Sequence, residues 1–252
     1  PPANPAAALP GAQGGAGALA QQHAGGGEAN ALGVPGASAA PAQGQANLQT
    51  GQQLATSGAQ NGVTACAGCH GAQGEGNAAG GFPRIAGQSA AYLGKQLGAY
   101  ANGARVNPIM QPIAKAMNAE QIRDVSAYYA SLGDAPAGAA TVGTKPSAAG
   151  TDRGATLSAI GDDARGVQAC ANCHGPGGVG NQPVYPYLAG QHANYLTAAM
   201  AAWKNGARKT DSSGQMTHVA QSLPDADVAA LSSYFSAQPA PPSAANWINI
   251  PA

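Results

Sequence analysis

Two short motifs hold all four cysteines of this 252-residue chain, and each motif ends in a histidine. "CAGCH" covers residues 66–70, and "CANCH" covers residues 170–174. In a C-x-x-C-H motif, the two thiols can form thioether bonds to the vinyl groups of a porphyrin, and the histidine can bind the iron. The sequence therefore predicts two covalently bound haem c groups, attached through Cys66, Cys69, Cys170 and Cys173, with His70 and His174 as iron ligands.

Two other uses of paired cysteines fit this sequence less well. A thioredoxin-like redox site needs strands and helices that alternate around the C-x-x-C pair, and the chain shows almost no strand-like runs. A structural zinc site places its two C-x-x-C pairs about 12 to 20 residues apart. These two pairs lie about a hundred residues apart, so haem attachment is favoured for both motifs.

The composition indicates that a large apolar cofactor has to complete the core. The chain contains 37 glycines but only two Phe and two Trp residues. A haem is a large apolar plate on which a small helical domain can pack. We therefore expect the haem-free chain not to fold.

Charge and hydropathy limit the partners of the chain. Its formal net charge is zero and only 9% of its residues are charged, which gives no reason to expect a nucleic acid as partner. No run of about twenty apolar residues is present, so no transmembrane helix is expected. The chain opens with Pro1 and Pro2 rather than Met, which indicates a processed form.

Residues 1–48 form a low-complexity segment of Ala, Gly, Pro and Gln. Glu28 is its only formal charge, His23 is its only imidazole, and no apolar periodicity runs through it. The composition is typical of a flexible arm or tether. Small side chains would let an extended backbone lie close along a neighbouring protein, so we favour an arm that binds a partner.

The remainder of the chain is an internal repeat. "FPRIAGQSAAYLGKQLGAYANGAR" at 82–105 matches "YPYLAGQHANYLTAAMAAWKNGAR" at 185–208, with an offset of 103 residues. Gly51 and Leu54 ahead of the first motif correspond to Gly154 and Leu157 ahead of the second. The repeat predicts one domain at 49–133 and another at 151–238, with a linker at 134–150 and a tail at 239–252.

Both repeats have the spacing of helices. Leu93, Leu97 and Tyr100 recur at helical spacing, which gives one apolar face, and the second repeat has the same pattern. Asn118 and Gln121 form a predicted capping box at the start of a last helix that ends at Gly133. Pro224 is predicted to open the equivalent helix of the second repeat. The fold class is therefore all-α.

The second axial ligand of each iron decides between an electron carrier and a catalyst. The repeat aligns Met200 with Leu97, and Met117 with Leu223, which are core positions. Met110 and Met216 align with each other, 40 and 42 residues after the histidines of their motifs. We expect Met110 and Met216 to be the ligands, because methionine raises the potential and leaves no open site.

Residues 50–238 resemble the two-domain dihaem cytochromes c of the cytochrome c4 family. The resemblance rests on the two C-x-x-C-H motifs, on F/Y-P-x-[IL]-A-G-Q-x-x-x-Y-L after each, and on the placed methionines. It implies two class I cytochrome c domains around a pseudo-twofold axis, with their haem propionate edges facing each other. It also implies that the carbonyl groups of Pro83 and Pro186 accept a hydrogen bond from the iron-binding histidines. The arm at 1–48 is a departure from that family.

The resemblance implies a periplasmic protein that transfers single electrons between a dehydrogenase or quinol-oxidising complex and a terminal acceptor. It could act as a carrier or as a permanent subunit of an oxidoreductase complex, held at a membrane by a partner or a removed N-terminal anchor. The low charge favours the subunit, because stable interfaces bury uncharged surface. The alternative is a dihaem enzyme of the peroxidase kind, against which the two matching methionines argue. His192 and His218 are each present in one repeat only and are interpreted as polar loop residues.

The arm yields a testable prediction. Deleting residues 1–48 is expected to leave both haem spectra unchanged and to weaken assembly with the redox partner. Ordering the arm costs about 1 kcal/mol or more per residue, so the partner has to supply many contacts. Co-purification of the truncated protein measures this, and undiminished recovery of the partner would show that the arm is only a tether.

Overall fold

The computed structural model of the chain describes residues 44–133 and 148–241, and side chains from Asp152 onward in the second range. Most of the predicted arm, linker and tail, together with His23, lies outside the described residues. The described residues of both repeats belong to one compact unit. In the described part of the chain no helix has both the length and the apolar character needed to cross a membrane.

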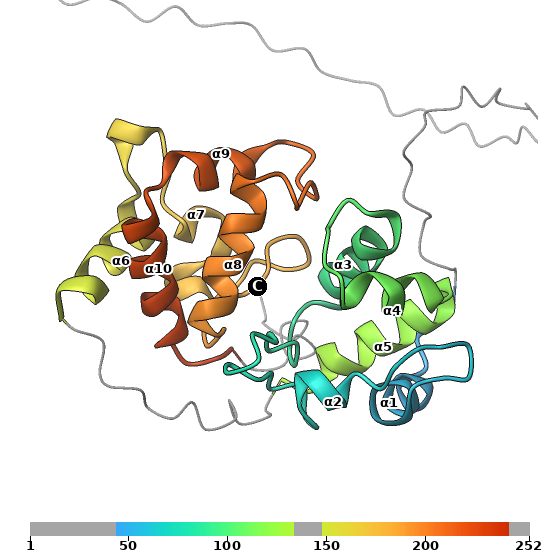
Figure 1. The fold of residues 1–252 in the computed structure, drawn as a ribbon. Coiled ribbons are helices and arrows are strands. Elements are labelled where there is room, and N and C mark those ends of the chain that lie inside the picture. Colours follow the sequence, from blue (N-terminus) through green and yellow to red (C-terminus); the bar gives the residue numbers. More distant parts are fainter. Residues whose placement is uncertain (1–43, 134–147, 242–252) are drawn as a thin grey trace, which may run out of the picture. The chain divides into compact units, whose positions relative to one another are not determined.

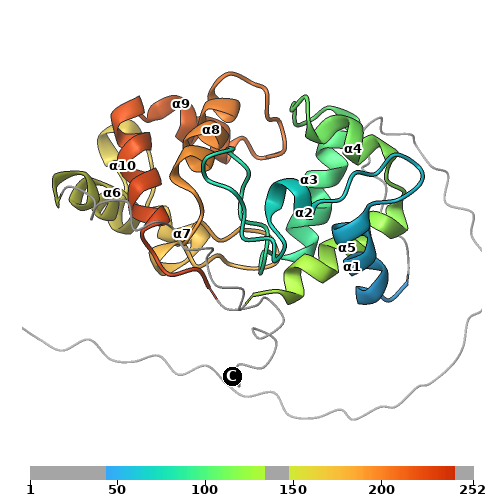
Figure 2. The ribbon, with the colours of Figure 1, turned by 60° about the horizontal axis from the view of Figure 1, so that its bottom comes forward.

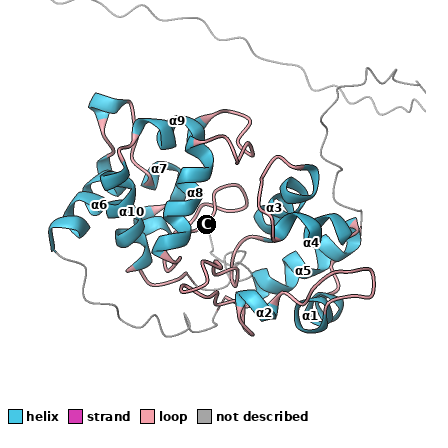
Figure 3. Cartoon of the chain, viewed as in Figure 1, coloured by secondary structure: helices cyan, strands magenta, loops and turns pink. Residues whose placement is uncertain are grey.

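Each repeat folds into a set of short helices (Figure 1). The first domain contains α1 (Leu48–Ser57), α2 (Ala67–His70), α3 (Ala90–Asn102), α4 (Met110–Ala116) and α5 (Ala119–Ser131). The second contains α6 (Ala148–Ile160), η1 (Asp163–Arg165), α7 (Ala171–His174), η2 (Pro176–Gly178), α8 (Ala193–Lys204), α9 (Gln215–Ser222) and α10 (Asp225–Ser236). The described residues form isolated bridges but no strand (Figure 3), and the predicted all-α class is confirmed.

Equivalent helices pack in the same way in the two domains. α1 and α3 contact α5 in the first domain, and α6 and α8 contact α10 in the second (Figure 2). Leu54, Val125 and Tyr129 are buried in the first apolar cluster. Leu157 and Phe235 are buried in the second. Leu93 and Leu97 of α3 pack against the first cluster, and Leu196 and Met200 of α8 belong to or pack against the second, so these residues of the predicted apolar faces do face the cores.

A glycine lets the first helix of each domain approach the last. A Cβ atom at Gly51 would lie 2.7 Å from Cβ of Tyr128 on α5, and one at Gly154 would lie 2.7 Å from Cβ of Tyr234 on α10. Real Cβ atoms do not come this close, so any side chain at these positions would push the helices apart. The two glycines that the repeat aligned thus allow the first and last helices of each domain to pack closely.

Helix ends are partly as the sequence predicts. Asn118 caps α5 in a capping box with Gln121, which confirms that prediction. Pro224 is the N-cap of α10 rather than its first helical residue, with ψ of 155°, so the helix begins at Asp225. α6 begins at Ala148, inside the predicted linker. α4 and α9 are short helices that the sequence did not indicate, because few of their side chains are buried.

The close helix contacts generate a prediction about stability. Gly51→Ala and Gly154→Ala are each expected to lower the free energy of unfolding of the haem-loaded protein by about 1 to 3 kcal/mol, as overpacking does. Denaturant titration followed by helical circular dichroism measures it. Gly98→Ala on α3 is the control, because a Cβ atom there meets no atom within 4 Å. Gly98→Ala is expected to be neutral or stabilising, since alanine is the better helix former; equal losses in all three variants would contradict the packing argument.

Candidate haem sites

Each motif histidine ends a one-turn helix and is fixed through one ring nitrogen. Nδ1 of His70, the last residue of α2, lies 3.0 Å from the carbonyl oxygen of Pro83. Nδ1 of His174, the last residue of α7, lies 2.8 Å from the carbonyl oxygen of Pro186. A carbonyl oxygen can only accept, so Nδ1 carries the proton in both rings. Nε2 of each ring is then the nitrogen left to bind a metal.

Both imidazoles are buried and neutral. His70 is 8% exposed and His174 is 7% exposed. Burial lowers the pKa of both imidazoles, although the hydrogen bonds to Pro83 and Pro186 act in the opposite direction. The rings of Phe82 and Tyr185 meet them edge-on, with centroids 6.1 and 6.0 Å away. A neutral imidazole held at a fixed angle is the form that binds iron.

Among the four cysteines, Cys66 and Cys170 do not have the lowered pKa of a redox thiol. All four are half-buried and none is in a disulfide. Burial raises the pKa of the Cys66 thiol, and it raises that of Cys170 to about 11. Catalytic thiols have a lowered pKa instead. The described residues also contain no group of three or more His, Cys, Asp or Glu that could hold a metal ion.

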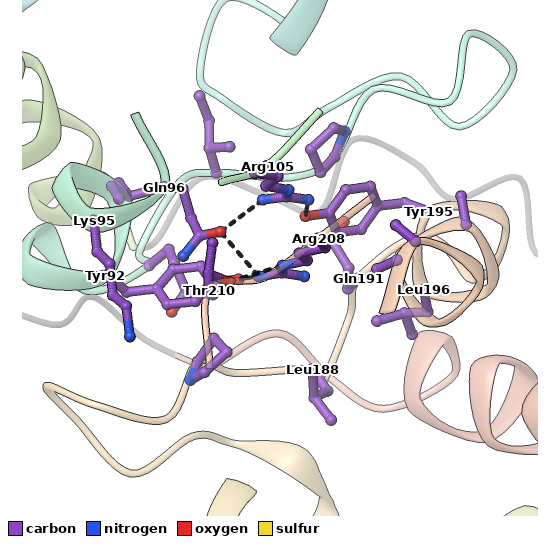
Figure 4. A pocket seen from close by; sticks show the side chains of 18 of the residues that line it. Tyr92, Lys95, Gln96, Arg105, Leu188, Gln191, Tyr195, Leu196, Arg208 and Thr210 are labelled. Atoms are coloured by element: carbon purple, nitrogen blue, oxygen red, sulfur yellow. Dashed lines mark hydrogen bonds between the residues drawn. The ribbon is translucent and has the colours of Figure 1, made fainter. Parts of the chain in front are cut away.

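The cysteines and histidines line a cavity of about 620 Å³. Residues of both domains form its wall, and Figure 4 shows some of them. Its wall is largely apolar, as a porphyrin plane requires. Residues from the first domain include Leu93, Leu97, Ile113 and Val125, and residues from the second include Leu188, Leu196, Val219 and Leu231.

All four methionines line this cavity, but their surroundings differ. Met117 packs against the apolar cluster of the first domain, and Met200 packs against that of the second. Met110 is the first residue of α4, and Met216 lies in the first turn of α9. The backbone N–H of Met110 donates to Oδ1 of Asn107 at 2.9 Å, which fixes this end of α4.

Two buried arginines provide an independent test of whether haem fits. Arg105 is 7% exposed and Arg208 is 6% exposed, and both line the cavity. Their hydrogen-bond partners in the described part of the chain are neutral: Gln96, Tyr195, Tyr92 and Thr210. Buried charges are costly unless a counter-charge accompanies them. A haem carries two carboxylates, the propionates, so the arginines fit the group that the cysteines and histidines would hold.

The arginines make equivalent contacts across the domain boundary (Figure 4). The guanidinium of Arg105 donates to the hydroxyl of Tyr195 at 2.9 Å, and that of Arg208 donates to the hydroxyl of Tyr92 at 2.9 Å. Oε1 of Gln96 accepts from both guanidinium groups, at 2.8 and 2.9 Å. Backbone bonds from Val106 to Ala207 and from Lys209 to Ala104, each 2.7 Å, join the same two loops.

The two remaining described histidines lie outside the residues that line the cavity. His218 was predicted to be a loop residue but lies in α9, and its Nε2 is 3.2 Å from the carbonyl oxygen of Gly166. His192 is the N-cap of α8, beside Gly76 of the first domain. The sequence did not lead us to Arg105, Arg208 and Gln96. The two arginines could have been found, because the matching blocks at 82–105 and 185–208 both end in N-G-A-R.

Comparison with known proteins agrees with this geometry. The family described as Cytochrome c matches residues 48–133 and 158–238. A protein described as a thiosulfate dehydrogenase electron acceptor, from Stutzerimonas stutzeri, is 44% identical over 157 residues, which cover 62% of this chain and 71% of that protein.

Two solved structures are similar to the fold. Thiosulfate dehydrogenase from Marichromatium purpuratum, in its as-isolated form, has a TM-score of 0.71 and 39% identity, and the match covers 77% of this chain and 40% of that one. Reduced recombinant cytochrome c4 from Pseudomonas stutzeri has a TM-score of 0.64 and 29% identity, and the match covers 77% of this chain and 100% of that one.

The methionine surroundings generate a prediction about the iron ligands. Met110→Leu and Met216→Leu are each expected to abolish the sulfur-to-iron charge-transfer band of one haem and to lower its potential, because leucine cannot bind iron. Absorption spectra and redox titration measure both effects. Met117→Leu and Met200→Leu are the matched controls and are expected to keep both bands at a cost under about 1.5 kcal/mol. Loss of a band in either control would mean that the repeat was misaligned.

Proposed function

Because the chain belongs to the cytochrome c family, with two of its domains in tandem, we propose that it is the electron acceptor of an enzyme that oxidises thiosulfate. The chain is a dihaem cytochrome c that carries electrons, and its resemblance to cytochrome c4 is confirmed. The relatives are described as electron acceptors and cytochromes, which favours electron transfer over the peroxidase-like alternative. Thiosulfate as the source of the electrons is our inference.

We infer the following roles for the residues of the sites. Cys66 and Cys69 would attach one haem and Cys170 and Cys173 the other. His70 and Met110 would bind the iron of the first haem, and His174 and Met216 that of the second. Pro83 and Pro186 orient the histidines, and Arg105 and Arg208 pair with propionates. The hydrogen bonds and burial described above support these roles.

The bound haems would supply reversible one-electron chemistry at iron, between the ferric and ferrous states. The residues around the haems would restrict that chemistry to electron transfer. With the buried histidines and the half-buried methionines as ligands, the irons would have no open position for a substrate. The apolar wall of the cavity favours the ferrous state, which carries one positive charge less. The hydrogen-bonded arginines limit the rearrangement of charged groups when the iron changes its charge.

The relatives support a lasting association with the enzyme. In the Marichromatium purpuratum protein, the region similar to this chain is part of a polypeptide of which it covers only 40%. This chain carries 9% charged residues and no net charge, so long-range charge attraction would contribute little to docking. We infer that docking depends on close apolar and hydrogen-bonded contact. Covalent haem attachment supports a periplasmic location, as the resemblance implies.

The test of this proposal is reduction by the enzyme. Oxidised protein is mixed with thiosulfate dehydrogenase and thiosulfate in a stopped-flow spectrometer. We expect both haems to become reduced, two electrons per chain, at a rate that rises with enzyme concentration. Mixtures without enzyme, or without thiosulfate, are the controls and are expected to stay oxidised. A protein that stays oxidised with enzyme and thiosulfate together, but is reduced by dithionite, would refute thiosulfate oxidation as the source.

A further inference from the structure

One glutamine of each domain forms hydrogen bonds to the backbone of the other domain. Oε1 of Gln191 accepts from the backbone N–H of Arg84 at 2.9 Å, and its Nε2 donates to the carbonyl oxygen of Arg84 at 2.9 Å. Gln88 makes the equivalent pair to Tyr187, at 3.3 and 3.4 Å. Gln88 is 3% exposed and Gln191 is 4% exposed. Both are the glutamines of the repeated A-G-Q sequence.

The peptide groups that these glutamines bind also hold the iron-binding histidines. The N–H of Arg84 and the carbonyl of Pro83 belong to the same peptide group. That group donates to Gln191 through its N–H and accepts from Nδ1 of His70 through its oxygen, at 3.0 Å. The group between Pro186 and Tyr187 donates to Gln88 and accepts from His174 at 2.8 Å. Each histidine is thus two hydrogen bonds away from a glutamine of the opposite domain.

We propose that Gln88 and Gln191 are positioning residues that act across the domain boundary. Gln191 of the second domain strengthens the hydrogen bond that holds His70 of the first, and Gln88 of the first domain strengthens the one that holds His174 of the second. This inference rests on haem ligation by His70 and His174, and it does not depend on the source of the electrons. A peptide group that donates through its N–H becomes a stronger acceptor at its oxygen, because hydrogen bonds in a chain polarise one another. The glutamine therefore strengthens the bond from Nδ1–H to the proline oxygen.

The strengthened bond has a defined effect on the iron. A histidine that donates its Nδ1–H more strongly is a more basic ligand at Nε2. A more basic ligand stabilises ferric iron over ferrous iron and so lowers the potential. Removing Gln191 is expected to raise the potential of the haem bound by His70, and removing Gln88 is expected to raise that of the haem bound by His174. Because the bonds of Gln191 are shorter, its removal has the larger effect.

The experiment is a redox titration of the purified haem-loaded protein followed by NMR, which reads the methyl signals of each haem separately. In Gln191→Ala only the first-domain haem is expected to shift upward in potential, and in Gln88→Ala only the second-domain haem. In the reduced protein, the Nδ1–H signal of the same histidine is expected to move upfield as its hydrogen bond weakens. Gln52→Ala is the surface control, because Gln52 is an exposed residue of α1.

The two alanine variants are matched controls for each other. If the glutamines only hold the domains together, each variant loosens the shared boundary and shifts both haems alike, which overturns the proposal. A potential shift confined to the haem of the domain that carries the substituted glutamine also overturns the proposal.

Gln191→Glu separates tuning from general loosening. A glutamate oxygen accepts from Arg84 N–H in either protonation state, so the first-domain potential stays at or below the wild-type value. If the first-domain potential rises as it does in Gln191→Ala, the oxygen that accepts from Arg84 N–H is irrelevant and the proposal is overturned. Both haems titrate in this experiment whether or not thiosulfate is the electron source, so the two proposals fail separately.

Discussion

Arg105 and Arg208 bring two positive charges into the boundary between the domains, where water is largely excluded. An isolated buried charge costs several kcal/mol. Aromatic faces offset part of that cost, since the guanidinium of Arg105 lies 4.7 Å from the ring centroid of Tyr100 and that of Arg208 lies 4.4 Å from Trp203. Neutral oxygens from the opposite domain supply hydrogen bonds, but only an anion balances the charge. The propionates would therefore contribute to joining the domains, which is a second reason to expect the haem-free chain not to fold.

Much of the helical fold could be predicted, because aligning the two repeats shows which of their positions are equivalent. The repeat located the apolar faces of α3 and α8 and aligned the two glycines at the helix contacts, while the capping-box pattern of Asn118 and Gln121 located the start of α5. It could not reveal α4 and α9, since each is about two turns long and buries one alanine. It also could not show that the A-G-Q glutamines bond to the opposite domain. Periodicity within one chain segment identifies a buried face, but it does not say which segment covers that face.

The pseudo-symmetry is broken at positions that line the cavity or stand close to the sites. Gln96, which joins the two arginines, is replaced by Ala199 in the second repeat, so one domain alone supplies this link. His192 of the second domain stands where the first has Ser89, and it lies against the loop at Gly76. The hydrogen bonds that reach the two histidines also differ in length. Two haems bound here would therefore have different electrostatic surroundings, and any difference in potential between them would give the electron a preferred direction.

The shared network has a consequence for how the two haems act together. Reduction of one iron removes one positive charge from a cavity that both domains line. Charges buried in a medium of low dielectric interact more strongly than charges in water. Because Gln96 binds both guanidinium groups, a change in charge beside one arginine is felt at the other. The first electron would therefore make the second harder to add. The electron added second would be held less tightly and would leave first, which suits a protein that is loaded by one partner and emptied by another.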